Sequence, residues 1–458
     1  MNRGRAIVLA MCSALVALGT LTGDRPATAL AAARPPGIDK IDHVIVIYQE
    51  NWSYDGLYGK FPGSNNLASA GAITQLDKDG KPLTSVPQPL VNGTPDPRFP
   101  ATLPVAAYDV NSYVKPDQTT GDLIHRFYHE QLQIDGGKMD KFVAWSDNGG
   151  LVLSYYDASS MPEGKLAAEF VMSDNFFHSA FGGSFANHFF LVCACMPTWP
   201  NAPASFVSNP DANNLADKQV TPDGYAVNTA YTVNNPHPAT VTDPAQLVPN
   251  QTMPTIGDRL SAAGVSWAWY AGGWNDALAG HPDKLFQFHH QPFAYFANYA
   301  DGTSGKKEHL KDESEFFAAI ASKQLPAVSF IKPLGPDNEH PGYANLQRGQ
   351  QHVADIVKAI RTSPYWNDSV IIITYDENGG RWDHVAPPVI DRWGPGTRVP
   401  TIIVSPYAKH NYVDHTQYET VSILSFIEAR WRLRPLGSRD ANANPLANAF
   451  DFSQAVQP

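Results

Sequence analysis

Residues 43–51 of this chain read HVIVIYQEN, and they contain the apolar run Val44-Ile45-Val46-Ile47-Tyr48. A short, mostly β-branched run of this kind is typical of a central strand in a parallel sheet, where both faces are buried. Glu50 and Asn51 follow at once, so their polar side chains lie at the carboxyl end of the predicted strand. Ligands of open α/β sheets bind beyond these strand ends, which makes both residues candidates for a site.

Three further runs have the same character: SVIIITYD at 369–376, TIIVS at 401–405 and AVSFI at 327–331. Helical patterns at 346–361 and 416–431 lie among these runs. Strands that alternate with helices predict an α/β fold with a mainly parallel central sheet flanked by helices. Residues 200–254 and 62–118 are loop-rich, and we expect the first to be an insertion of loops and hairpins that roofs the site.

The composition narrows the possible functions. Of 458 residues, 33 are Lys or Arg and 44 are Asp or Glu, which gives a formal net charge of -11. This acidic balance argues against a nucleic-acid binder, which needs a basic surface. Hydrophobic residues make up 43% of the chain, enough for a large packed core, whereas charged residues make up only 17%.

The first 31 residues have the features of a signal peptide. Arg3 and Arg5 precede a mostly apolar run at 6–19, and the small residues of Ala29-Leu30-Ala31 suit a cleavage site. The run is too short for a membrane-spanning helix, although an uncleaved membrane anchor is the alternative. We therefore expect a protein exported to the periplasm, the cell surface or the medium. Export permits a disulfide between Cys193 and Cys195, and two buried free thiols are the alternative.

The densest polar cluster is Asp376-Glu377-Asn378-Gly379-Gly380, followed closely by Asp383-His384. Adjacent carboxylates at a strand end, next to glycines that let the backbone fold closely, suit a hard divalent cation. Solvated acids in a turn are the structural alternative. Glu50 and Asn51 would supply two more oxygen ligands, although Asn51 alone is also a good helix cap.

Ser184 follows Gly182-Gly183, which predicts a tight turn that presents the serine at the start of a helix. A serine in this position acts as a nucleophile if a metal lowers its pKa, and a simple capping serine is the alternative. Four of the 15 histidines stand out: His125 on an expected helical stretch at 122–133, the pair His289-His290, and His340 in a Pro/Gly turn. Imidazoles of this kind bind phosphoryl oxygens or protonate a leaving group, although a lone histidine is more often structural.

Three motifs, in this order, are together highly specific: Gln49-Glu50-Asn51-Trp52-Ser53-Tyr54-Asp55, then Thr374-Tyr375-Asp376-Glu377-Asn378-Gly379-Gly380 with Asp383-His384-Val385-Ala386-Pro387-Pro388, and Gly394-Pro395-Gly396-Thr397-Arg398-Val399-Pro400. They resemble the secreted bacterial phosphoesterase family that unites acid phosphatases with phosphocholine-preferring phospholipases C. The resemblance implies an alkaline-phosphatase-like fold in a single catalytic domain at 38–458, because Glu50 and Glu377 must meet.

Within this family the chain resembles the acid phosphatase branch most. Phe288-His289-His290-Gln291-Pro292-Phe293 and the segment 134–142 are similar to that branch. The phospholipase branch tends to have a threonine nucleophile in a Gly-Pro-Thr-x-x-Asn-Arg setting, where this chain has Ser184 and His188 in place of the threonine and arginine. This departure lowers the expectation of phospholipase activity.

The resemblance also implies a role for each candidate residue. One divalent metal ion (Ca²⁺, Mg²⁺, Mn²⁺ or Zn²⁺) is bound by Glu50, Asn51, Asp376, Glu377 and Ser184. Ser184, His289 and His340 are catalytic; His125, Asn187, His290 and Asn51 contact the substrate; Asp383 and His384 have a supporting role.

The activity expected from this assignment is hydrolysis of small phosphomonoesters through a phosphoserine, with an acidic optimum. Because the motifs offer little Lys or Arg, we expect the metal and protonated histidines to supply the positive charge that phosphoryl transfer needs. A phospholipase C acting on phosphocholine lipids, with membrane contact, is the alternative. A non-catalytic surface binding protein is a distant third possibility. The sequence carries no information on the oligomeric state.

Overall fold

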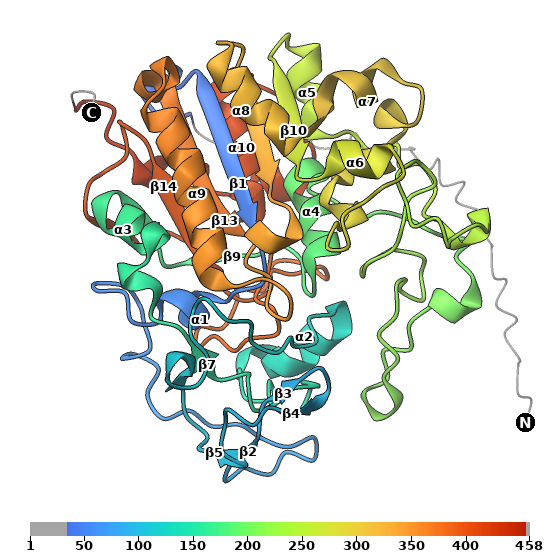
Figure 1. Ribbon diagram of the computed structural model, residues 1–458, viewed down its shortest axis with the longest axis vertical. Coiled ribbons are helices and arrows are strands. Elements are labelled where there is room, and N and C mark those ends of the chain that lie inside the picture. Colours follow the sequence, from blue (N-terminus) through green and yellow to red (C-terminus); the bar gives the residue numbers. More distant parts are fainter. Residues whose placement is uncertain (1–33, 455–458) are drawn as a thin grey trace, which may run out of the picture.

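A computed structural model describes residues 34–454 of the chain (Figure 1), so the expected signal peptide at 1–31 lies outside the described residues. An eight-stranded sheet forms the centre, in the order β11-β10-β12-β1-β13-β14-β8-β15. The bounds are β11 (Leu310–Asp312), β10 (Trp267–Ala271), β12 (Val328–Lys332), β1 (His43–Gln49), β13 (Ser369–Tyr375), β14 (Thr401–Val404), β8 (Val171–Ser173) and β15 (Tyr412–Asp414). All neighbouring strands are parallel except where β14 runs against β13 and β8.

The position of β1 explains why its end carries the site. This strand is flanked by β12 and β13, both parallel to it, and the register pairs Ile47 with Ile331 and Ile373. The three strands therefore end at the same edge of the sheet. Glu50, Lys332 and Asp376, which follow or close these strands, are thereby brought together from three distant parts of the chain.

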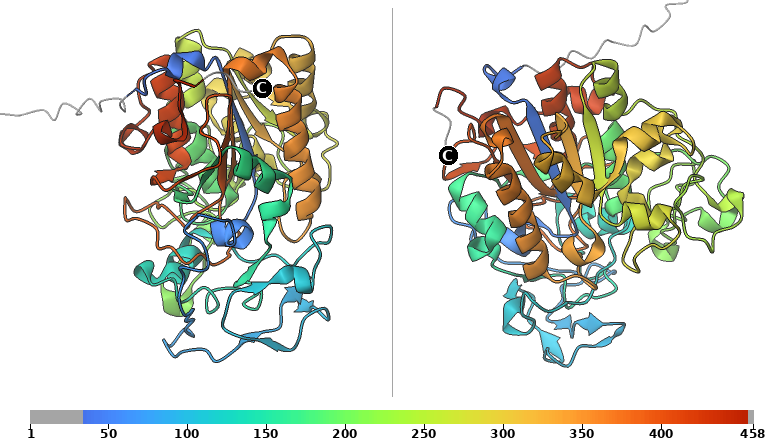
Figure 2. Two further views of the ribbon diagram at one scale, coloured as in Figure 1. Left: turned by 90° about the vertical axis from the view of Figure 1, so that its left-hand side faces the viewer. Right: turned by 45° about the horizontal axis from the view of Figure 1, so that its top comes forward.

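Helices cover both faces of the sheet, with α9 and α10 on opposite sides (Figure 2). One layer contains α3 (Pro162–Glu169), α8 (Glu313–Ala321) and α9 (Leu346–Arg361); the other contains α4 (Ser184–Cys193), α5 (Ile256–Ala262) and α10 (Thr420–Trp431). The α9 helix buries one stripe, which includes Val353, Ile356 and Ile360. Such a stripe at helical spacing is what packs a helix onto a sheet.

Smaller elements surround this core. The remaining helices are α1 (Tyr54–Tyr58), α2 (Phe127–Ile134), α6 (Trp274–Leu278), α7 (Ser304–His309) and α11 (Ser438–Ala441). Four short strand pairs complete the fold: β2 (Val86–Pro87) with β5 (Thr102–Leu103), β3 (Leu90–Val91) with β4 (Thr94–Pro95), β6 (Tyr108–Asp109) with β7 (Ser154–Tyr155), and β9 (Phe176–Phe177) with β16 (Tyr418–Glu419). In Figure 1 the loops of residues 62–118 gather below the carboxyl ends of the central strands.

The structure confirms the expected α/β architecture and its four predicted strands. The helix expected at 346–361 has those bounds, whereas the one expected at 416–431 begins only at Thr420, because Tyr418 and Glu419 pair with β9. The helical stretch expected at 122–133 is wrong at its start: α2 begins at Phe127, so His125 lies in a loop. Residues 200–254 consist of short 3-10 turns and isolated bridges.

Two further observations concern the cysteines and the helices. Cys193 and Cys195 form a disulfide at the end of α4, which decides between the two alternatives left open by the sequence.

Across residues 34–454, none of the helices has both the length and the apolar character that crossing a membrane requires.

Candidate active site

A cavity of about 420 Å³ opens at the edge of the sheet where β1, β12 and β13 end. Its lining comes from segments far apart in the sequence and includes six of the candidate residues: Glu50, His125, Ser184, His289, His290 and His340. Gln219, Asn228 and Thr229 of the loop-rich segment 200–254 also contribute to the wall. The fold thus brings most of the residues singled out in the sequence into one place.

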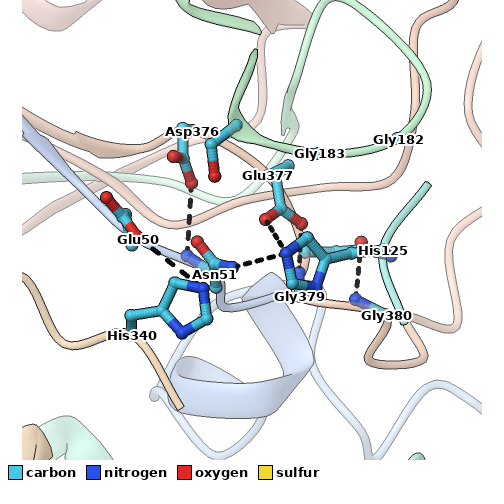
Figure 3. A network of polar contacts seen from close by, with 12 residues as sticks. Glu50, Asn51, His125, Gly182, Gly183, His340, Asp376, Glu377, Gly379 and Gly380 are labelled. Carbon is cyan, nitrogen blue, oxygen red and sulfur yellow. Dashed lines mark hydrogen bonds and ion pairs between the residues drawn. The ribbon is translucent and has the colours of Figure 1, made fainter. Parts of the chain in front are cut away.

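Four oxygen-bearing side chains converge beside this cavity (Figure 3). Glu50, Asn51, Asp376 and Glu377 are each at most 1% exposed. The backbone amide of Asn51 donates to Asp376 Oδ1 at 3.2 Å, which fixes the end of β1 against the end of β13. Asn51 has a φ of 70°, a left-handed conformation that asparagine tolerates better than most residues.

The donor set fits a divalent cation. Asn51 Oδ1 and Glu377 Oε1 are buried, yet neither accepts a hydrogen bond within the described chain. Buried polar atoms normally have partners, so such orphaned oxygens indicate a missing one. Burial, and next to it the charge of Asp376, raises the pKa of Glu377 well above its usual range. Carboxylate and amide oxygens crowded in this way are ligands for a hard metal ion.

A lysine that the sequence analysis did not consider lies among these acids. The Lys332 Nζ atom is 2.9 Å from Glu50 Oε1 and 3.3 Å from Asp376 Oδ2, and its side chain is fully buried. Lys332 adds positive charge to the oxygen cluster and Arg126 is part of the cavity lining, so the expectation that Lys and Arg contribute little positive charge here is wrong. A signal was present: Lys332 directly follows the apolar run 327–331, just as Glu50 follows 44–48 closely.

Ser184 begins α4 and faces the cavity, as its glycine turn predicts. Gly182 has a φ of 86°, and a Cβ there would come within 2.5 Å of the Phe127 nitrogen. At Gly183 an added Cβ would come within 2.7 Å of the His125 carbonyl oxygen. The Gly182 amide donates to the buried Glu130 carboxylate at 2.6 Å, which holds the turn. Glycine is thus required at both positions.

Asn187 does not line the cavity. Its Oδ1 accepts from the Ala180 amide at 2.9 Å, and its Nδ2 donates to the carbonyls of Ala180 and Gly183 at 3.0 and 3.3 Å. The side chain is fully buried. Instead of facing a substrate, it ties the first turns of α4 to the loop before Ser184.

His125 and His340 lie side by side at the mouth of the site, with ring centroids 5.6 Å apart. His125 Nε2 is 3.2 Å from Asn51 Nδ2 and 3.8 Å from Glu377 Oε1. His340 Nε2 is 3.9 Å from Glu50 Oε2, and its ring stacks on Tyr343 with centroids 4.3 Å apart. Both imidazoles therefore lie between the oxygen cluster and the cavity.

His289 and His290 also line the cavity. His290 Nε2 contacts Glu50 Oε1 at 2.6 Å, while His289 Nδ1 has no hydrogen-bond partner within the described residues. Burial lowers the pKa of both imidazoles, because it removes water from the charged form. The ring of His188, for which no role was predicted, stacks on His290 with centroids 5.2 Å apart.

Asp383 and His384 belong to a separate buried cluster with Asp55. These three side chains lie close enough together to hold an ion. However, Arg398 already lies among them: its Nε donates to Asp383 Oδ1 at 2.9 Å and a terminal nitrogen donates to Asp55 Oδ1 at 3.2 Å. His384 Nδ1 contacts Asp55 Oδ2 at 2.6 Å. The cluster is a charge network with its own cation, and none of its residues lines the cavity.

A mainly parallel sheet with carboxylates at its strand ends and a serine at a facing helix start is the arrangement expected of a phosphoester hydrolase. More particularly, the chain belongs to the Phosphoesterase family, whose model matches residues 41–434. This establishes the family that the motifs indicated.

Several curated relatives are named phospholipases C. The non-hemolytic phospholipase C of Burkholderia pseudomallei is 26% identical over 482 residues, an alignment that covers 94% of this chain and 62% of the relative. Phospholipase C B of Mycobacterium tuberculosis is 22% identical, with 96% and 83% covered. The chain thus spans less than two thirds of the length of the Burkholderia protein.

Solved structures with a similar arrangement include a Vibrio parahaemolyticus protein of the alkaline phosphatase superfamily, with 10% identity and a TM-score of 0.33 over 59% of this chain and 60% of that one. Murine ectonucleotide pyrophosphatase/phosphodiesterase 5 has 10% identity and a TM-score of 0.35 over 63% and 94%. These similarities are too low to support an argument, so the fold is described from the strand order of this chain.

Proposed function

We propose that this protein is an exported, metal-dependent acid phosphatase that hydrolyses phosphomonoesters through a phosphoserine on Ser184. The observation that carries the proposal is the cavity itself: Ser184, Glu50 and four candidate histidines face the same space. A nucleophile, a cation site and proton donors in one cavity are the parts that phosphoryl transfer requires.

The side chains would divide the work as follows. Glu50, Asn51, Asp376 and Glu377 would hold a divalent ion, which would lower the pKa of the Ser184 hydroxyl and neutralise charge at the phosphoryl group. Ser184 Oγ attacks phosphorus, and the free amides at the start of α4 favour the phosphoryl oxygens. His125 and His340 donate to these oxygens, while His289 gives a proton to the leaving oxygen. Water then hydrolyses the phosphoserine and frees Ser184.

The phospholipase C alternative has the names of the relatives in its favour. Recognition of a choline group usually relies on an open cage of aromatic rings. Phe185 and Tyr343 are the aromatic residues among the cavity lining, apart from the histidines. The Tyr343 hydroxyl already donates to Glu50 Oε2 at 3.2 Å and its ring stacks on His340, so this ring is not free to form a cage. The lining therefore favours a small polar phosphomonoester.

The test compares p-nitrophenyl phosphate with p-nitrophenylphosphorylcholine at pH 4 to 9. We expect faster hydrolysis of the monoester, with an optimum at acidic pH, and loss of activity after metal removal by a chelator. Ser184→Ala should lower kcat by about 1000-fold or more, because the covalent step is lost. The control Ser205→Ala changes an exposed serine outside the cavity and should leave kcat unchanged.

Four results would count against the proposal. A strong preference for the phosphorylcholine ester would favour the phospholipase alternative. A rate that keeps rising through alkaline pH would exclude an acid phosphatase. Full activity of Ser184→Ala would remove the nucleophile, and lack of any hydrolysis by the wild-type protein would favour a binding function.

A further inference from the structure

Lys332 lies among the acids of the oxygen cluster, and the proposed reaction gives it no role. It closes β12, between β10 and β1, and is fully buried. Its Nζ atom lies near three acceptors: Glu50 Oε1 at 2.9 Å, Asp376 Oδ2 at 3.3 Å and the Gln49 carbonyl oxygen at 3.4 Å. It also lies 5.2 Å from the centre of the Tyr48 ring. The ammonium group is therefore enclosed by the metal-ligating acids and by β1.

Lys332 does not line the cavity. Of the two acids that Lys332 contacts, only Glu50 lines the cavity. An effect of Lys332 on a substrate beside Ser184 therefore passes through Glu50 and Asp376.

The charges of the three carboxylates indicate how Lys332 affects the site. Glu50, Asp376 and Glu377 carry three negative charges when ionised, and each is buried. Uncompensated buried charges are very costly, so a stable site needs nearly equal positive charge. Lys332 supplies one positive charge and one divalent ion supplies two, which balances the three carboxylates. A second divalent ion would leave the site with excess positive charge, and the ammonium group already lies between Glu50 and Asp376.

We propose that Lys332 is the permanent counter-cation of this site, where it takes the place of a second metal ion. It holds Glu50 Oε1 and Asp376 Oδ2 in position before the metal binds and limits the site to one divalent ion per chain. This is a positioning role, and it rests on the proposed metal-dependent function.

The test counts metal ions. Metal-depleted wild-type protein is titrated with Mn²⁺ in a calorimeter, and the bound manganese per chain is measured by mass spectrometry after dialysis. The same is done with Lys332→Ala, which removes both the charge and its volume. Lys311→Ala is the matched control, because Lys311 lies on the neighbouring edge strand β11 and pairs with the half-exposed Glu315.

We expect one Mn²⁺ per chain for the wild type and the control, and two for Lys332→Ala. The thermal midpoint of Lys332→Ala should also rise more on Mn²⁺ addition than that of the wild type. Two ions, or none, in the wild type would overturn the proposal, as would one ion bound with unchanged affinity in Lys332→Ala. If Lys332→Ala does not fold, the wild-type ratio decides alone.

Hydrolysis of p-nitrophenyl phosphate is measured on the same samples to separate the two proposals. A wild-type chain that binds one ion but hydrolyses no ester would contradict the proposed function and leave the role of Lys332 supported. An active wild-type chain that binds two ions would support the proposed function and contradict the role of Lys332.

Discussion

Asn51 shows how much of the site depends on one residue. Its amide nitrogen donates to Asp376, its Nδ2 lies 3.2 Å from His125 Nε2, and its Oδ1 remains free for a cation. The backbone turns there with a φ of 70°. A Cβ at Gly379 would come within 2.3 Å of the Asn51 carbonyl oxygen, so glycine is required for the two strand ends to meet. Each polar atom of Asn51 thus has a separate task.

At the same scale, Glu377 should be essential for metal binding. Its Oε2 accepts from the Gly379 amide, and its Oε1 has no hydrogen-bond partner among residues 34–454, so Oε1 is the atom left for a cation. Loss of a residue that only supports a ligand already weakens metal binding by roughly 10- to 100-fold. We expect Glu377→Gln to weaken Mn²⁺ binding by at least about 100-fold in a calorimetric titration. The exposed Glu308→Gln should bind Mn²⁺ like the wild type; equal binding by both variants would refute the assignment.

At the scale of elements, the two helices α4 and α10 pack against each other on one face of the sheet. The α4 helix presents Ser184 at its first position, where free backbone amides favour an anion. The α10 helix is buried along nearly its whole length, including Glu428. A carboxyl group inside such a helix makes the stability of this layer depend on pH.

Burial, together with the neighbouring carboxyl of Asp440, raises the pKa of Glu428 to about 10 from an ordinary 4.5. The folded chain therefore keeps a proton that the unfolded chain releases between these two pH values. The stability from this group is complete below about pH 4.5 and is lost progressively as the pH rises toward 10.

Glu428→Gln should remove this dependence, because the amide stays neutral at every pH. We expect the variant to gain stability over the wild type from pH 5 to pH 9 in urea unfolding, and to match it near pH 4. Glu308→Gln is again the exposed control and should follow the wild-type curve. Parallel curves for Glu428→Gln and the wild type would contradict an elevated pKa.

At the scale of the whole molecule, Arg398 connects parts of the chain that lie far apart in sequence. Its guanidinium donates to the Asn65 carbonyl at 2.8 Å, the Asp174 carbonyl at 2.7 Å and Asp383 Oδ1 at 2.9 Å. The loop after α1, the end of β8 and the loop after β13 are thereby joined at one buried cation. This network stabilises the edge of the sheet that carries the candidate site.

Arg398→Met should destabilise the fold by about 3–5 kcal/mol, because it leaves Asp55 and Asp383 buried without a counter-charge. Urea unfolding of the metal-loaded protein measures this loss. Arg392→Met is the matched control, since Arg392 and its partner Asp223 are exposed, and it should cost at most about 1 kcal/mol. Equal losses in the two variants, or rescue of Arg398→Met by added Mn²⁺, would contradict this role.

Much of this was predictable from local pattern. The runs at 44–48 and 370–373 identified the two strands that carry the acids, and Gly182-Gly183-Ser184 identified the start of α4. Lys332 was missed although it follows a run of the same kind, because a lysine at a strand end is ordinarily solvated. Asn187 was given a substrate role because its motif position says nothing about where its side chain points.

Apolar patterning and turn chemistry are short-range properties, so the residues themselves establish the α/β class, the strands that end in acids and the glycine turn before Ser184. Local pattern does not determine which strand ends meet, because this depends on the order of strands from segments hundreds of residues apart. The order β12-β1-β13 brings Lys332 within 2.9 Å of Glu50 and 3.3 Å of Asp376, whereas Arg398 pairs with Asp55 and Asp383 in a cluster that does not line the cavity. Only the folded chain distinguishes a candidate metal site from a structural ion network.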